Sequence, residues 1–437
     1  MTFGVLMLLA SPAFAATKYA RAAGGNWSAD ATWSTSSGGG ADTTKCVAAD
    51  ACILDSASGN VTVDAASAAG SLNCTGYTGT LTLGANLTVS GSITLVSGMT
   101  FTPSIYTVAI DGVSTLTTGG KSFYDLTLAV AGTLTLADEV TVTNDLTHGA
   151  ANMNIAGAFN INVGGDFTRN TGTNYRFGFT GAGACTVVMN GTGNLSSANG
   201  MDINTKLTIN TAGTVTIAGG LNFGEYNSAT WTYTTGTVSA GTSVVTILGA
   251  CTLNTSGMSF YGITFSGTPV TLTSDLTSTN SMKNGAANVV FTASSARVLH
   301  CQGDFSRTSG TGYRFGYLGS TNTTLTFDGA NNQQLGDANN CLIDIPVIIN
   351  KSGFTLTLAN TITFGENNSP TWTYTAGTVA AGTSTLAIAG SCTLNTNGMS
   401  WYDVTTVTAG TTTLTSALDV NRNLTIGAST TLAPGAN

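Results

Sequence analysis

The chain has few charged residues, few prolines and almost no histidine. Of its 437 residues, 13 are Lys or Arg, 21 are Asp or Glu and 2 are His. Charged residues therefore make up 8% of the chain, against about a quarter of an ordinary globular domain. The net charge is −8 and no basic run occurs, so the chain lacks the positive surface that nucleic acid or anionic lipid requires. We expect neither as a partner.

Glu and Lys, which favour helices, are scarce as well. The sequence has only 6 prolines and little Glu or Lys, whereas Gly (55 residues), Thr, Ser, Ala and Asn are abundant. Hydrophobic residues nevertheless reach 42%, which is enough to fill a core and argues against disorder. Alternating aliphatic residues favour strands over helices. The composition therefore predicts a folded, nearly all-β chain.

The sequence repeats itself with a period of about 140 residues. GDFTRNTGTNYRFG at 165–178 returns as GDFSRTSGTGYRFG at 303–316, an offset of 138. ATWTYTTGTVSAGTS at 229–243 returns as PTWTYTAGTVAAGTS at 370–384, an offset of 141. Three residues were thus gained between the two blocks. Such repetition is typical of elongated scaffolds and repeated binding surfaces.

Short hydrophobic doublets predict the fold. In residues 61–101 hydrophobic residues occur two apart, and from residue 81 the doublets start about every six residues, whereas sandwich strands recur every 8 to 12. We predict an all-β, elongated parallel β-helix, or β-solenoid, with about 20 residues per turn and about seven turns per period. The equivalent residues Tyr261 and Tyr402 should then lie on the same side of one coil. Tandem β-sandwich domains are the alternative.

The first 15 residues resemble an export signal. MTFGVLMLLASPAFA is apolar and ends in Ala13-Phe14-Ala15, the small-x-small pattern that precedes signal cleavage. We predict cleavage after Ala15; a buried first strand is the alternative. No later stretch is apolar and long enough to span a bilayer. We therefore expect an exported protein without a membrane span.

The remaining chain divides into a cap and a coil. Residues 16–60 carry Trp27 and Trp33 in a polar, Gly-rich context and should cap the N-terminal end, because exposed end turns of a solenoid invite aggregation. Residues 61–437 should form the solenoid, and its copies of the repeat are predicted at 106–147, 148–284 and 285–427, the last incomplete.

The eight cysteines divide into one pair and six single residues. Cys46 and Cys52 lie six apart in a loop, so an oxidising compartment would favour a disulfide between them. Cys251 and Cys392 are repeat equivalents that alternate with leucine, which is typical of buried small hydrophobic residues. No CxxC motif or Cys/His cluster occurs, so we expect no metal site and no cofactor.

The N-terminal segment also resembles a known group of proteins. GGNWSADATWSTSSGGG, AADACILD and SLNCTGYTGTLTL, within residues 24–83, are similar to the start of repetitive β-rich proteins of phage and environmental viral genomes. The Gly/Thr doublets resemble the passengers of bacterial adhesins. The resemblance implies a structural or receptor-facing role and carries no catalytic residue.

Two sets of polar and aromatic residues recur in both copies. Asp166, Arg169, Arg176 and Glu225 return as Asp304, Arg307, Arg314 and Glu366, and we expect them to form structural ion pairs at turns. Aromatic residues flanked by Arg suit sugar stacking, although stacking between neighbouring turns is the alternative. The candidate ligand-binding residues are Tyr175, Arg176, Trp231, Tyr233, Tyr313, Arg314, Trp372 and Tyr374.

These observations favour a non-enzymatic extracellular rod, either a surface adhesin or a virion fibre component. Its expected partners are cell-surface glycans or other copies of itself; its oligomeric state stays open. The alternative is a polysaccharide-degrading lyase or hydrolase on the same fold, since such enzymes use clustered acids with Lys or Arg in a groove. His148 and His300 fall at non-equivalent positions, and we predict no catalytic residue.

Overall fold

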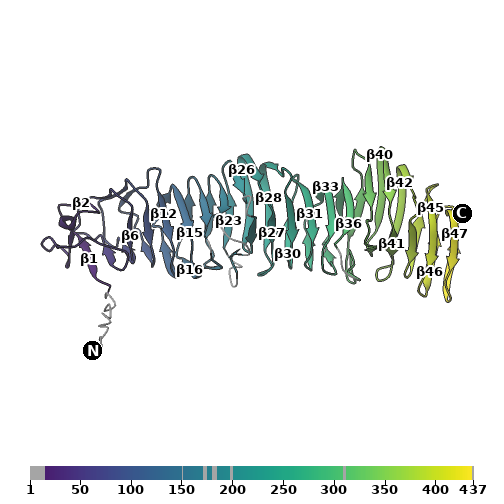
Figure 1. Ribbon diagram of the computed structural model, residues 1–437, viewed down its shortest axis with the longest axis horizontal. Coiled ribbons are helices and arrows are strands. Elements are labelled where there is room, and N and C mark those ends of the chain that lie inside the picture. The colour runs from purple at the N-terminus through teal and green to yellow at the C-terminus, as the bar shows by residue number, and fades with distance from the viewer. Residues whose placement is uncertain are drawn as a thin grey trace, which may run out of the picture. The chain divides into compact units, whose positions relative to one another are not determined.

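The computed structural model describes residues 15–149, 151–170, 175–179, 185–196, 200–308 and 312–435. It is a β-solenoid of about 18 turns, and its contacts divide the chain into two units, Met1–Ile161 and Asn162–Asn437. Strands pair in parallel from turn to turn (Figure 1), which confirms the predicted fold and excludes tandem sandwiches, because these are antiparallel.

The first unit consists of three ladders of parallel strands. One ladder comprises β1 (Thr17–Ala20), β4 (Ala51–Ile53), β7 (Ser71–Asn73), β10 (Ile93–Thr94), β13 (Ser114–Thr117), β16 (Gly132–Leu136) and β19 (Met153–Ala156). The second comprises β6 (Ser67–Ala69), β9 (Leu87–Val89), β12 (Thr107–Ile110), β15 (Asp125–Leu128) and β18 (Leu146–His148). The third side holds β2 (Gly25–Asn26), β5 (Val61–Val63), β8 (Thr80–Leu83) and β11 (Thr100–Thr102), and then the pair β14 (Ser122–Phe123) and β17 (Val140–Val142).

The N-terminal end of this unit is built around two tryptophans. β3 (Trp33–Ser34) pairs antiparallel to β1, after a 3₁₀ turn at Asp30–Thr32. Trp27 and Trp33 are buried and pack edge to face with ring centroids 4.8 Å apart. Both indole N–H groups donate to backbone carbonyls, those of Cys46 and Trp27. The predicted aromatic cap is thus part of the core, and it is continuous with the first ladders.

The second unit also has three ladders, which we call ladders 1, 2 and 3. Ladder 1 contains β23 (Thr186–Met189), the first part of β26 (Lys206–Ile217), β28 (Thr230–Ser239), β30 (Cys251–Asn254), β32 (Val270–Leu272) and β34 (Phe291–Thr292). It continues through the bridges of Phe315 to Val289 and Ile343 into β39 (Cys341–Ile343), β41 (Thr361–Phe364), β43 (Thr385–Ile388), β45 (Ser400–Thr406) and β47 (Asp419–Ile426).

Ladders 2 and 3 share several long strands, each of which has one part in ladder 2 and another in ladder 3. Ladder 2 contains the first part of β33 (Leu276–Asn284), β35 (Arg297–Cys301), β37 (Thr323–Phe327), the first part of β40 (Val347–Leu358), β42 (Thr371–Ala380), β44 (Cys392–Asn395), β46 (Gly410–Leu414) and β48 (Thr430–Pro434). Ladder 3 contains β22 (Arg176–Phe177), β25 (Met201–Ile203), β27 (Leu221–Phe223), β29 (Val244–Ile247), β31 (Ser259–Phe265), the second part of β33, β36 (Asp304–Arg307), β38 (Gln333–Leu335) and the second part of β40.

Equivalent strands of the two copies do not lie on the same side of the coil. β30 belongs to ladder 1, whereas its equivalent β44 belongs to ladder 2. β29 belongs to ladder 3, whereas its equivalent β43 belongs to ladder 1. Along ladder 1, six steps lead from β30 through β32, β34, Phe315, β39 and β41 to β43, and β44 follows on the next side. One period is therefore six turns plus one of three sides.

This register contradicts the expectation that Tyr261 and Tyr402 share one side, seven turns apart. Tyr261 lies in β31 between its ladder 2 and ladder 3 parts, where Phe260 pairs with Ser278 and Gly262 with Ser281. Tyr402 lies in β45, on the approach to ladder 1. The expectation failed because turns vary in length: Phe305 and Leu335 are partners in successive turns although 30 residues separate them. Backbone pairing between turns does not require a period to contain a whole number of turns.

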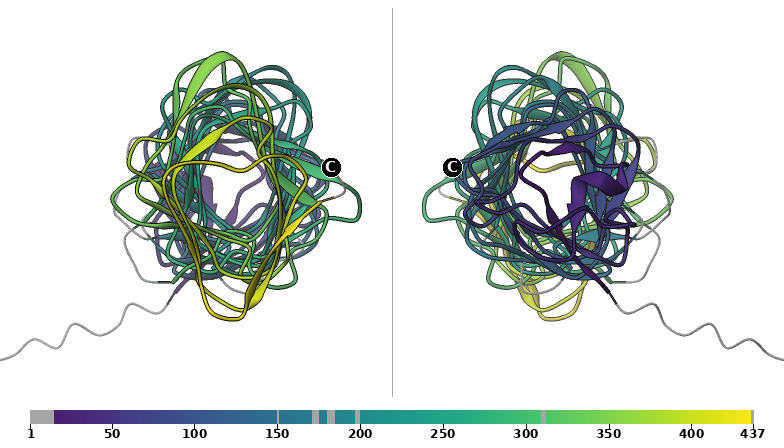
Figure 2. Two further views of the ribbon diagram at one scale, coloured as in Figure 1. Left: turned by 90° about the vertical axis from the view of Figure 1, so that its right-hand side faces the viewer. Right: turned by 90° about the vertical axis from the view of Figure 1, so that its left-hand side faces the viewer.

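The core of both units is built from the alternating doublets. Strand residues such as Leu207, Leu253 and Leu394 point inward and are fully buried, while the threonines between them are partly exposed. Figure 2 shows the turns of the second unit end-on as closed loops, teal to yellow. Inward-facing side chains stacked on those of the next turn give a continuous core.

The cysteines follow the predicted division. Cys46 and Cys52 form a disulfide with Cα atoms 6.0 Å apart, which confirms the predicted pair. The six other cysteines are buried and free. Burial raises the pKa of the Cys251 thiol to about 12 and that of the Cys392 thiol to about 11, so these thiols stay protonated near neutral pH.

Candidate functional site

The first recurring cluster is centred on Arg176 and spans three successive turns. Arg176 begins β22, Asp202 lies opposite it on β25, and Glu225 follows β27 one turn further on. The Arg176 guanidinium donates two hydrogen bonds to the Glu225 carboxylate, that of Nη2 to Oε1 at 2.8 Å. The central carbon of the guanidinium group, Cζ, lies 5.5 Å from the ring centroid of Phe179 and 5.3 Å from that of Tyr226. This cluster combines an ion pair with two half-exposed or exposed aromatic rings.

The second cluster is centred on Arg314 and repeats the ion pair with a different surrounding. Arg314 pairs with Glu366, and its Nε lies 3.4 Å from Oδ2 of the buried Asp344. Asp344 accepts hydrogen bonds from the Glu366 backbone N–H and from the Asn367 amide, both at 2.8 Å. Asn367 stands where the first copy has Tyr226. The second cluster is therefore more polar than the first.

Burial raises the pKa of one carboxyl group in each cluster. In the first cluster this group is Asp202, and the hydrogen bond from Asn222 and the charges of Arg169 and Arg176 partly oppose the rise in its pKa. Burial likewise raises the pKa of Asp344, against the hydrogen bond from Asn367 and the charge of Arg314. A buried carboxylate beside an arginine is typical of structural ion-pair networks as well as of active sites, so this feature alone does not assign a reaction.

A polar groove of about 360 Å³ lies beside the second cluster. It crosses successive turns and is lined by Ala296, Ser320, Asn322, Thr323, Thr324, Asp344, Ile345, Pro346, Asn368, Ser369, Pro370 and Thr371. Its hydroxyl and amide groups can exchange hydrogen bonds with a sugar. Among the residues the structure describes, Asp344 is the one acid that lines this groove, whereas glycoside hydrolysis typically needs two.

The two candidate tryptophans are core residues. Trp231 and Trp372 are fully buried. Trp231 packs edge to face against Phe223 and Phe260 at 5.3 and 5.5 Å, and Trp372 packs against Phe364 and Trp401 at 5.4 and 5.0 Å. Their assignment as ligand-binding residues is therefore wrong, because no ligand can reach an indole enclosed between turns. The alternative, stacking between neighbouring turns, is correct for both.

The candidate tyrosines are half-buried. The hydroxyl of Tyr233 donates to the carbonyl of Gly236 at 2.6 Å, and that of Tyr374 donates to the carbonyl of Gly377 at 2.5 Å. Each of these hydroxyl groups forms a hydrogen bond within its own strand, β28 or β42, and stabilises the bend of that strand. Tyr175 and Tyr313 precede the two arginines and are partly exposed. All four tyrosines are thus partly exposed, and Tyr175 with Arg176 and Tyr313 with Arg314 are the ones that belong to the two arginine clusters.

Each recurring aspartate accepts hydrogen bonds from the following turn. Asp166 accepts hydrogen bonds from the backbone and side-chain N–H groups of Asn194, at 2.7 and 3.0 Å. Its equivalent Asp304 accepts one from the Gln334 backbone at 2.8 Å. Both carboxylates thus connect one turn to the next. Arg169 and Arg307 are more than nine-tenths buried.

A buried lysine that was not predicted from the sequence connects two insertions. The second copy has five residues at 329–333 where the first has three at 191–193, and one further residue near 351–354. Lys351 is fully buried; its ammonium group donates to the carbonyls of Gly329 and Asn331 at 2.8 Å and to the Gln333 side chain. The change in offset between copies was the available signal. It located the insertions but not the contact between them.

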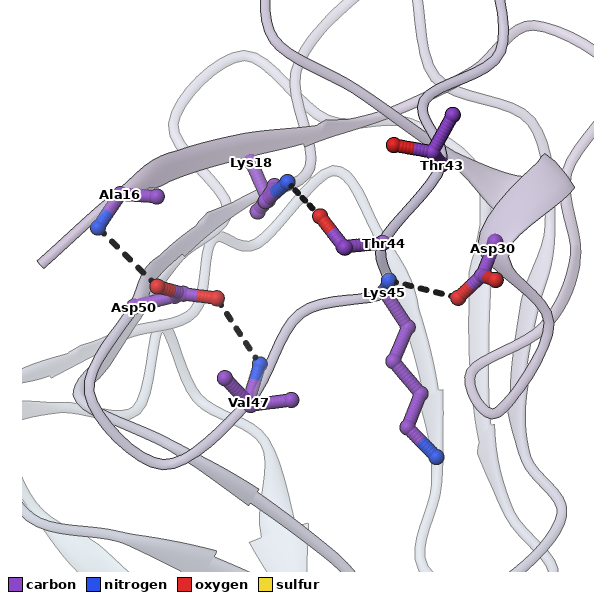
Figure 3. A pocket seen from close by; sticks show the side chains of 8 residues that line it. All are labelled: Ala16, Lys18, Asp30, Thr43, Thr44, Lys45, Val47 and Asp50. Atoms are coloured by element: carbon purple, nitrogen blue, oxygen red, sulfur yellow. Dashed lines mark hydrogen bonds between the residues drawn. The ribbon is translucent and has the colours of Figure 1, made fainter. Parts of the chain in front are cut away.

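A second pocket, of about 450 Å³, lies at the N-terminal end of the first unit. It is lined by Ala16, Lys18, Asp30, Thr43, Thr44, Lys45, Val47 and Asp50 (Figure 3). Lys18 is buried and pairs with Asp42 and Thr44. Asp50 accepts hydrogen bonds from the backbone N–H groups of Ala16 at 3.0 Å and Val47 at 3.1 Å. This pocket was not anticipated from the sequence.

Comparisons with protein-family models, curated proteins and solved structures find no match to this chain. The fold itself gives the class, a parallel β-solenoid. The similarity to phage-encoded and adhesin proteins has no support from a relative. Within the described ranges, no three His, Cys, Asp or Glu residues lie close enough to hold a metal ion. No helix in this part of the chain has the length and apolar character needed to cross a bilayer.

Proposed function

We propose that the protein is a non-enzymatic extracellular structural or adhesive protein, a surface adhesin or a virion fibre component, that binds glycans through its repeated surface clusters. One observation carries this proposal: Tyr175 with Arg176 and Tyr313 with Arg314 recur at the surface of both copies, beside aromatic rings in one and a polar groove in the other. Aromatic and guanidinium faces stack on sugar rings, and amides bind their hydroxyl groups.

The arrangement of the two clusters favours one kind of ligand. They lie six turns and one side apart, because Arg176 is on ladder 3 and Arg314 adjoins the ladder 1 bridge of Phe315. Six turns correspond to roughly 30 Å at the spacing of β-strands. A long flexible polysaccharide can follow such a path and occupy both clusters, which adds avidity. A flat array of short glycans would meet one cluster at a time.

The guanidinium groups support binding over catalysis. Both arginines are already paired with glutamates, so neither is free to neutralise a substrate carboxylate, a step that polysaccharide lyases need. Export would place the protein outside the cell or at the cell surface; a virion surface is the alternative location. Other copies of the chain are a second possible partner of the same clusters.

The test is a glycan array probed with the purified chain, with release of reducing ends measured in parallel. Tyr175→Ala and Tyr313→Ala should each weaken binding of a long polysaccharide severalfold, and the double variant should nearly abolish it. Tyr261→Ala, at a half-buried tyrosine outside the clusters, is the matched control. Unchanged binding in a folded double variant, or binding to no glycan, would overturn the proposal; release of reducing ends would establish the enzyme alternative.

A further inference from the structure

The N-terminal pocket holds a buried carboxylate beside the residue that follows the predicted cleavage site. Asp50 is 6% exposed, and its Oδ1 lies 3.0 Å from the backbone nitrogen of Ala16. Figure 3 shows the Ala16 nitrogen directed at this carboxylate, with Val47 on the other oxygen. Because Ala16 follows Ala13-Phe14-Ala15, its nitrogen is the atom that cleavage after Ala15 would convert into a free amine.

Ala16 is also where the chain joins the fold. Its carbonyl accepts the Ala51 backbone N–H at 2.8 Å, and β1 begins at the next residue, between β3 and β4. Ala15 is exposed and lies outside any strand. The bond between Ala15 and Ala16 is therefore at the surface, while the nitrogen on its far side is held in the pocket.

Asp50 lacks a cationic partner among the described residues. Its two oxygens accept backbone N–H groups, from Ala16 and Val47. The nearby cation Lys18 pairs instead with Asp42, and Lys45 contributes its backbone N–H to Asp30. A buried carboxylate is stabilised most by a charged donor. An ammonium group at Ala16 would supply one without any movement of the chain.

We propose that Ala16 is the N-terminus of the mature protein and that its α-ammonium group forms an ion pair with Asp50 that completes the N-terminal cap. The inference rests on the proposed export. An export peptidase adds one water across the Ala15–Ala16 peptide bond, which leaves a carboxylate on Ala15 and an amine on Ala16. The amine binds a proton at neutral pH, since the pKa of an α-amine is about 8. One neutral donor to Asp50 thereby becomes a charged one.

The ion pair strengthens the part of the fold that carries the disulfide. Asp50 lies between Cys46 and Cys52, and its backbone carbonyl accepts the N–H groups of Gly70 and Ser71 in the following turn. Cleavage would thus tighten contacts among β1, the disulfide loop and the next turn. Export and closure of the solenoid end are coupled through one residue.

The experiment compares three forms of the chain. Protein exported from a host that cleaves signal peptides is first analysed by intact mass and N-terminal sequencing, which should give Ala16 as the first residue. Asp50→Asn is then introduced into a chain that starts at Ala16, a chain that keeps Ala15 as an extra residue, and the uncleaved chain. Hydrogen exchange of backbone amides 47–54 reports on the cap.

We expect Asp50→Asn to speed this exchange about fivefold more in the chain that starts at Ala16 than in the other two, because only there is a charged donor lost. The same speeding in all three forms, or a mature N-terminus at another residue, would overturn the proposal. Absence of any processing in the exporting host would count against the proposed extracellular function as well. Glycan binding should be equal in all three forms, so its loss would concern the proposed function alone.

Discussion

The two copies in the second unit have the same succession of strands on different sides of the coil. β28 and β30 belong to ladder 1, and their equivalents β42 and β44 belong to ladder 2, yet Trp231 and Trp372 are equally buried and each packs against two aromatic rings. The inward pattern of a turn therefore specifies its packing on the turns above and below. It does not specify the side of the coil on which that turn begins.

The copies differ at buried and half-buried polar positions instead. Lys351 replaces Thr211, and the pair His300 and Asp328 replaces Asn162 and Asn190. Lys351 binds the loop that is two residues longer in the second copy. The Lys351 difference thus follows the local length of a turn, whereas His300 and Asp328 replace two asparagines at the same separation of 28 residues.

The largest expected effect tests the equivalence of the cores. Trp231→Ala and Trp372→Ala should each lower the free energy of unfolding by about 3 to 5 kcal/mol, since each leaves a cavity among buried rings. Thermal and denaturant unfolding would measure both, with Tyr175→Ala as a surface control. A loss in one copy that is less than half of the loss in the other would show that the side of the coil does affect packing.

The second prediction concerns Lys351 and the longer loop that it binds. Lys351→Thr, which installs the residue of the first copy, should cost about 2 kcal/mol, because buried carbonyl groups lose a charged donor. Replacing residues 329–333 by the three-residue segment of 191–193 in the same variant should restore most of this loss. No rescue in the combined variant would refute the coupling between the two insertions.

The third prediction concerns the two ion pairs. Glu225→Gln should cost up to about 1 kcal/mol, and Glu366→Gln less than half as much, since partly exposed pairs contribute little and Arg314 keeps Asp344. Denaturant unfolding of the two variants at low salt would compare them. An equal or larger loss for Glu366→Gln would contradict the supporting role of Asp344.

The smallest expected effect is the pH dependence of the stability that the pair His300 and Asp328 contributes to the second copy. The hydrogen bond from His300 to Asp328 raises the pKa of His300, against partial burial. The folded state therefore binds a proton more tightly than the unfolded state. This stabilisation is complete below the ordinary pKa of 6.5 and is lost as pH rises through the higher value of the folded state.

The double variant His300→Asn with Asp328→Asn, which reproduces the first copy, removes this titration. Its melting temperature should differ from that of the parent chain more at pH 5 than at pH 8. A difference that grows with pH would contradict the assigned direction of the shift.

Much of the fold could be predicted from single residues, while the site depended on three-dimensional register. Doublets such as Leu356 and Leu358 have strand periodicity whatever their neighbours are, so the solenoid was predicted. The disulfide was predicted because Cys46 and Cys52 lie six residues apart in one loop. The pairing of Arg176 with Glu225 joins residues 49 apart, and its partner depends on the exact length of two turns. The burial of Trp231 could not be predicted either, because the sequence does not distinguish an aromatic residue that points into the core from one that points outward.

The one-side offset between copies makes the repeat a screw operation with threefold character. Three periods of six and one-third turns amount to about 19 turns, or roughly 90 Å at β-strand spacing. A protein that added copies with the same offset would present each motif along a helical track, and every third motif would return to its starting azimuth. Lengthening by duplication would then change the direction in which a motif points as well as its distance from the end. The number of copies, rather than the residues within them, would decide which motifs can engage one surface together.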